Sequence, residues 1–162
     1  MKRSLLYKSI RDRILATMPS IVYVDMNKGQ VHGGKDHYPF PKPAVLIQIK
    51  SASYTDVSRL CQLGNVTVSV TLCQECMTDS FDGAEIDDAN IDMLNEQDDL
   101  YLNIHGLIPG DGWGVMMRKS ESGAVLKNGI AETTVEFSIS KKELMPASTT
   151  TRTVPIAIKI QV

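Results

Sequence analysis

Cys73 and Cys76 have the spacing of a redox or metal-binding pair. Thiolates two residues apart can bind zinc or exchange disulfides. A zinc site needs four ligands, and the sequence has neither a second such pair nor two histidines at zinc-finger spacing. A redox pair normally stands at a helix N-terminus, which lowers the thiol pKa, whereas this pair ends a predicted strand. We therefore interpret both cysteines as small core residues and predict no metal and no cofactor.

Residues 27–37 form a polar loop with several glycines, and they hold the next candidate ligands. His32 and His37, with Asp36 beside them, could bind a metal, but polar loops of this kind are usually just solvated. The run through Lys35 lacks the complete pattern of a phosphate-binding loop. We keep His32 and Lys35 only as candidate contacts for a protein partner.

No local signature of a hydrolase, kinase or metalloprotease occurs in the sequence, so we predict that the protein is not an enzyme. A catalytic site assembled in space from distant residues would leave no such signature. The alternative from this class is an intracellular thiol- or metal-dependent enzyme that uses Cys73, Cys76 and His105.

Charge is distributed unevenly along the chain. Nine of the 19 acidic residues lie between positions 79 and 99, where Phe81 breaks the calcium-loop pattern at its third position. The first 13 residues carry the opposite sign. Two regions of opposite sign suit a head-to-tail contact between copies of the chain. The candidate contact residues are Lys8, Arg11, Arg13, His32, Lys35, Asp82, Glu85, Asp87 and Asp88.

The overall composition narrows the class of protein. A net charge of −2 argues against a specific nucleic-acid binder, which usually has a basic excess. No 18-residue apolar run is present, so we expect no membrane span. Charged residues from Lys8 onward interrupt any signal-peptide core, and three cysteines do not make a disulfide framework. These features favour an intracellular setting.

Periodicity predicts one α+β domain over residues 1–162: an antiparallel or mixed sheet with two amphipathic helices on one face. Ser4 is the expected N-cap of the first helix, which ends near Met18 before Pro19. The second helix is expected at 90–107. Strands are expected at 21–24, 44–49, 53–59, 63–76, 113–119 and around 133–139, with 120–129 rich in turns and a last strand at 154–162. The strand 63–76 is expected to be a half-buried antiparallel strand, with an apolar face (Val66, Val68, Val70, Leu72) and a second face formed by Thr67, Ser69, Thr71 and Cys73.

Three prolines in YPFPKPAVLIQI (38–49) stiffen the entry to a buried strand. This stretch, of the form PxPxPAVxIxI, resembles the tail-completion (tail terminator) proteins of tailed bacteriophages and prophages. The likeness continues through VTVSVTL (66–72), the acidic loop, MLNEQDDLYLNIHGL (93–107) and AETTVEFSI (131–139). It covers residues 4–140 and leaves 154–162 unmatched.

The resemblance implies a structural protein of the virion tail or neck, assembled in the cytoplasm of a bacterial host. Such a protein forms an oligomeric ring, commonly a hexamer, that caps the tail tube and gives the head a surface to join. The implied partners are other copies of the chain, the tail tube protein and the head–tail connector proteins. Another connector or tail tube component is the alternative within this class. The family has no catalytic residues to transfer.

Overall fold

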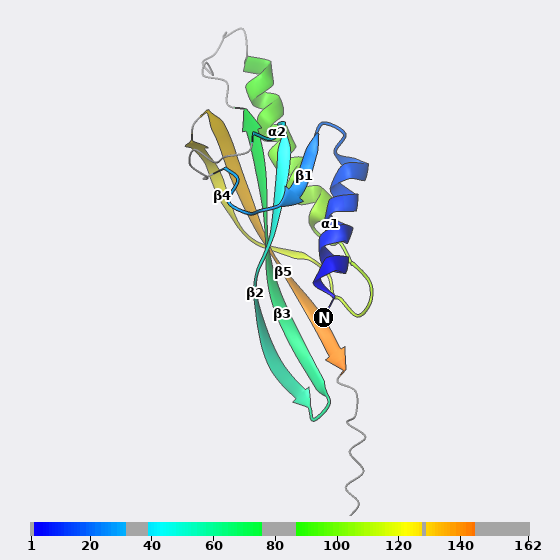
Figure 1. The fold of residues 1–162 in the computed structure, drawn as a ribbon. Helices are drawn as coiled ribbons and strands as arrows, with labels where there is room; N and C mark the ends of the chain where they lie inside the picture. The colour runs from blue at the N-terminus through cyan, green and yellow to red at the C-terminus, as the bar shows by residue number, and fades with distance from the viewer. Residues whose placement is uncertain (1, 32–38, 76–86, 128, 145–162) are drawn as a thin grey trace, which may run out of the picture.

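The computed structural model describes residues 2–31, 39–75, 87–127 and 129–144. Within them lie one five-stranded sheet, in the order β1-β2-β3-β5-β4, and two helices on one of its faces (Figure 1). β1 is parallel to β2, and every other neighbouring pair is antiparallel. The predicted α+β class with a mixed sheet is therefore confirmed. The elements are α1 (Arg3–Thr17), β1 (Tyr23–Met26), β2 (Ala44–Ser58), β3 (Cys61–Glu75), α2 (Asp87–Ile104), β4 (Met117–Lys127) and β5 (Ile130–Leu144).

α1 follows its apolar period. Leu6, Ile10 and Ile14 are one turn apart and fully buried against the sheet. The prediction of Ser4 as N-cap is wrong, because the helix begins at Arg3, two residues earlier than that cap would place it. Lys2 takes the cap position without a side-chain hydrogen bond, and its carbonyl accepts from the Leu5 N–H at 3.1 Å.

β1 begins two residues later than predicted, because its start is set by pairing with β2. The Val22 N–H bonds to the Pro43 carbonyl at 3.0 Å, and Tyr23 is the first residue in register, opposite Ala44. The buried Ile21 enters the core before the strand begins. Hydrophobic content alone placed the strand on these entry residues.

β2 joins the two predicted extended pieces into one strand of 15 residues. A bulge makes this possible: Ile49 lies opposite Val68 and Ser51 opposite Thr67, so Lys50 is the extra residue. The bulge reverses the alternation, and consequently Ile47 and Ala52 both face the helices despite their odd separation. Beyond it, β2 and β3 continue as a long hairpin past the helix layer (Figure 1). We call residues 51–65 the arm.

The main core lies between the sheet and the helices. β3 contributes its alternating valines and Leu72, and β5 contributes Val135, Phe137 and Ile139. Leu100 and Ile104 cover them from α2. α2 begins and ends about three residues before the predicted bounds, and it stops where Gly106 takes φ +82°.

The second face of the sheet is more buried than predicted. Ser69, Thr71 and Cys73 are 3 %, 4 % and 0 % exposed, although they form the polar side of the β3 alternation. The reason at one end is the proline-rich stretch, which packs back on this face. Phe40 is buried there in a small cluster with Leu46 and Cys73.

β4 corrects the prediction for residues 113–129. Trp113 makes only an isolated bridge to Lys141, whereas the expected turn-rich part belongs to β4. Register shifts before Ser120 and between Ser122 and Val125 accommodate the small residues that looked like turn signals. The predicted last strand at 154–162 lies outside the described residues.

Candidate interaction surfaces

The predicted basic contacts lie on α1. Lys8 and Arg13 are exposed, while Arg11 donates from Nε and Nη2 to the neighbouring Asp12 Oδ1 at 2.9 and 2.7 Å. That pair partly neutralises the charge of this helix face, and at an exposed site it adds little stability. Of the three predicted basic contacts, Lys8 and Arg13 are therefore the ones that make no ion pair with another described residue.

The predicted acidic contacts divide between described and undescribed residues. Asp87 and Asp88 begin α2, whose positive dipole end favours acidic residues. Asp82, Glu85, His32 and Lys35 lie outside the described residues. Both helices occupy one layer and run in opposite directions, so the start of α1 and the start of α2 lie at opposite ends of that layer (Figure 1).

Cys73 is placed where thiolate chemistry is unfavourable. Burial, with the nearby Glu132 carboxylate adding to it, raises the pKa of Cys73 to about 12. The thiol is therefore protonated at neutral pH. Cys76 lies outside the described residues, and His105 follows α2, on the opposite side of the sheet from Cys73. His105 Nδ1 accepts from the Arg118 N–H at 3.3 Å, and its ring lies 5.2 Å from that of Tyr101.

Across the described ranges, no three His, Cys, Asp or Glu side chains gather closely enough to hold a metal ion. Neither α1 nor α2, the two helices of those ranges, is long and apolar enough to cross a membrane.

A small polar cluster surrounds Asp25 at the end of β1. Its carboxylate accepts from Lys28 Nζ and from the Tyr23 hydroxyl, each at 3.0 Å, and from the Met26 N–H at 2.7 Å. Burial alone would raise the pKa of Asp25, but these hydrogen bonds outweigh it and hold the pKa below its usual value. Tyr23 also stacks on Phe40 at 5.7 Å. The cluster thus fixes β1 to the proline-rich stretch beside a hollow of about 320 Å³.

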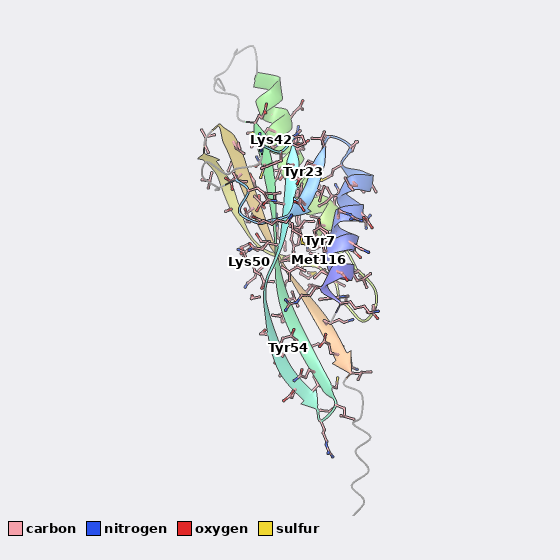
Figure 2. The ribbon with its side chains drawn as sticks, viewed as in Figure 1. Tyr7, Tyr23, Lys42, Lys50, Tyr54 and Met116 are labelled. Carbon is pink, nitrogen blue, oxygen red and sulfur yellow. The ribbon has the colours of Figure 1, made fainter. Side chains whose placement is uncertain are left out.

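A second polar cluster lies on the same face of the sheet, at the bulge (Figure 2). Lys50 Nζ is 2.6 Å from Glu136 Oε1, and the Ser120 hydroxyl donates to Glu136 Oε2 at 3.1 Å. The Lys50 contact lowers the pKa of Glu136, with the Ser120 bond as the next cause. Because β3 lies between β2 and β5, the ion pair crosses above Ser69 and explains why that residue is buried.

Exposed apolar side chains gather at three places that the sequence analysis did not single out. The first is the arm and its β5 neighbour, the second is the outer face of α2, and the third is β4. Their members are Tyr54, Val57, Leu60, Leu63 and Leu144; Ile91, Leu94 and Leu102; and Met117, Val125 and Leu126. Positions 91, 94 and 102 share one side of a helix, opposite the buried Leu100. This spacing in the sequence was the signal from which the apolar surface on α2 could have been predicted.

Such surfaces on one small chain are typical of proteins that bind other proteins. The described geometry holds apolar and charged contact surfaces, a protonated buried thiol and small polar clusters whose groups satisfy one another. This arrangement suits assembly.

No protein-family model matches the sequence, and no curated protein matches it significantly. Among solved structures, the fold is similar to that of a chain described as "Virion of native gene transfer agent (GTA) particle". The two share 10 % identity with a TM-score of 0.51, over 85 % of this chain and 94 % of that one. The shared property is the fold.

Proposed function

We propose that this protein is a structural component of a phage or phage-like virion. The observation that carries the proposal is the fold similarity to a chain of a gene transfer agent virion, which spans nearly all of that chain. The order of the sequence motifs supports it independently, because the resemblance to tail-completion proteins rests on residues rather than on coordinates. A protein in this role acts through shape and charge, without catalysis.

Within that class, we propose the role of a tail terminator: a closed ring, commonly of six copies, that caps the tail tube and offers the head a joining surface. A ring uses two different surfaces on each copy, and it closes only when the rotation per copy is right. The outer face of α2 and the arm supply two separate apolar surfaces of this kind. The basic residues along α1 and the acidic residues at the start of α2 add an electrostatic contribution to the choice of contact.

The experiment is to measure the mass of the purified chain by light scattering over a wide concentration range and to image it by negative stain. Closed rings near six copies of the 17.9 kDa chain are the expected result. Open-ended tubes would instead support the alternative of a tail tube component. A chain that stays monomeric, both alone and with purified tails of the source phage particle, would overturn the proposal.

The position of the chain within the particle is tested by a separate measurement. Gold-labelled antibody against the chain should mark the head-proximal end of the tail in intact particles. Label along the whole tail, or its absence from particles, would contradict the terminator role.

A further inference from the structure

The unpaired edge of β2 carries an inference about the last segment of the chain. β1 pairs only with Ala44–Ile47, so within the described residues β2 has no strand on that side from Gln48 to Ser58. Alternate backbone N–H and C=O groups of this stretch point outward without a ladder partner. Lys50 and Asp56 are its only charges, and it contains no proline. Charged residues, bulges or a covering element protect such edges, and beyond the bulge at Lys50 only Asp56 remains as a charge.

An apolar hollow lies beside the upper part of this edge. It encloses about 370 Å³ and is lined mainly by Tyr7 of α1, Met26 of β1, and Ile47 and Ile49 of β2. Figure 2 shows Tyr7 on the helix side of the sheet and Tyr54 further down the arm. A strand added to the edge, with one apolar face, would fill this hollow and continue over the exposed ring of Tyr54.

Residues 154–162 have the required pattern. Val154, Ile156, Ile158, Ile160 and Val162 fall on one face of a strand. The intervening residues include Pro155 and Lys159, which are typical of the outermost strand of a sheet. Nine strand residues extend about 30 Å, which matches the unpaired part of β2.

The strand order brings residues 154–162 to the tip of the arm and sets the direction in which they run along β2. β5 ends at Leu144, which lies opposite Cys61 at the tip of the arm. β2 and β5 are both antiparallel to β3 and run toward that tip. A chain that turns back after Leu144 therefore runs antiparallel to β2. Residues 145–153 can span up to about 30 Å, whereas the lateral step from β5 to a strand on the far side of β2 is about 15 Å.

We propose that residues 154–162 add to the sheet of their own copy as a strand antiparallel to the unpaired edge of β2, with Ile160 and Val162 filling the hollow beside Tyr7. The inference rests on the edge, the hollow and the chain direction, and it holds whether or not the protein belongs to a virion.

Hydrogen exchange of the full chain, measured by mass spectrometry, tests it. About half of the amides at positions 50–58 point away from β3, and in the wild type these should exchange at least about tenfold more slowly than in Ile158→Pro. Proline removes a ladder donor and disfavours the pairing. Thr150→Pro, in the connection, is the matched control and should leave this protection in place. Amides of β3 and β5 report whether each variant is folded.

Side-chain substitution gives a second readout. Ile160→Lys should speed exchange at positions 48–54, whereas Gln161→Lys, on the other face of the strand, should not. Equal exchange at 50–58 in the wild type, in Ile158→Pro and in a chain shortened after residue 153 would overturn the proposal. Protection that disappears on dilution would overturn it as well, because the strand would then come from another copy.

Discussion

Phe40 is the residue that makes the proline-rich stretch part of the fold. It stacks on Tyr23 and is buried on the second face of the sheet, with Lys42 Nζ 5.5 Å from its ring centre. We predict that Phe40→Ala lowers the free energy of unfolding by about 3 kcal/mol, since it removes a buried aromatic ring. Urea unfolding followed by circular dichroism measures this. Pro39→Ala, at the exposed neighbouring position, should cost far less, and an equal loss would show that the ring itself is unimportant.

Asp25 should make stability depend on pH. Its pKa is lowered in the folded chain, because the bonds from Lys28, Met26 and Tyr23 outweigh burial. A lowered carboxyl pKa stabilises the fold above the unfolded value, and this contribution is lost as the pH falls through the folded value. The stability difference between wild type and Asp25→Asn should therefore be largest above about pH 5 and shrink toward about pH 3. Urea midpoints across this range measure it, and a difference independent of pH would refute the prediction.

Cys73 should be chemically silent in the folded protein. Its thiol is fully buried and its pKa is raised to about 12, chiefly by burial and further by Glu132. Alkylation at about pH 8 followed by peptide mapping should leave Cys73 unlabelled until urea unfolds the chain. If Cys73 of the native protein reacted as fast as a free cysteine, the thiol-enzyme alternative would regain support.

At the scale of elements, secondary structure was predicted most accurately where a single hydrophobic period runs through the element. α1 has an uninterrupted four-residue recurrence and was found near its bounds, and the eight-residue alternation located the middle of β5, which extends further at both ends, from Ile130 to Leu144. The bulge at Lys50 was not predictable, because it depends on what lies across the strand rather than on the strand itself. The sequence predicts turns over most of β4, after residue 119, for the same reason: small residues there fall at register shifts against β5.

The sequence could predict which types of residue make the candidate contacts, but not all the surfaces on which they lie. In the structure Lys8 and Arg13 are exposed on α1, while Arg11 is half-buried and paired with Asp12. The apolar surface on α2 was missed because helical spacing alone does not show which apolar side faces the core, whereas in the structure Leu100 and Ile104 fix the helix rotation. Burial of the second face could not be foreseen from β3 alone, since Phe40 comes from a segment outside the sheet.

The bulge leads to a prediction about the arm. Deleting Lys50 would let Ile49 and Ser51 follow each other opposite Val68 and Thr67, so every other pair keeps its partner and its face. We expect the chain to fold, with a loss of about 1 kcal/mol or less from the missing ion pair with Glu136. Deleting Ile47 removes a buried side chain and shifts the register, so that variant should not fold stably. Thermal unfolding of both variants measures this, and similar losses would argue against a bulge at Lys50.

At the scale of the whole molecule, the proposed virion role requires a chain that is stable alone and also holds surfaces for its neighbours. The described chain divides these tasks: the core lies between the sheet and the inner sides of the helices, while α2 keeps apolar residues on its outer side. Leu102 is 65 % exposed and Leu94 57 %, so neither contributes much to the monomer. In the proposed assembly, both side chains would be buried against another chain.

The double variant Leu94→Asp/Leu102→Asp should consequently separate folding from assembly. We expect its unfolding free energy to stay within about 0.5 kcal/mol of the wild type, because both sites are exposed surface positions. If the wild type forms the proposed ring, the mass of the double variant by light scattering should fall to that of the single chain, because two carboxylates cannot be buried in an apolar contact without a partner charge. Leu15→Asp, at an exposed position on α1, is the matched control and should still assemble. Assembly by the double variant at wild-type concentrations would exclude the outer face of α2 from the interface and leave the arm and β4 as the surfaces that join the copies.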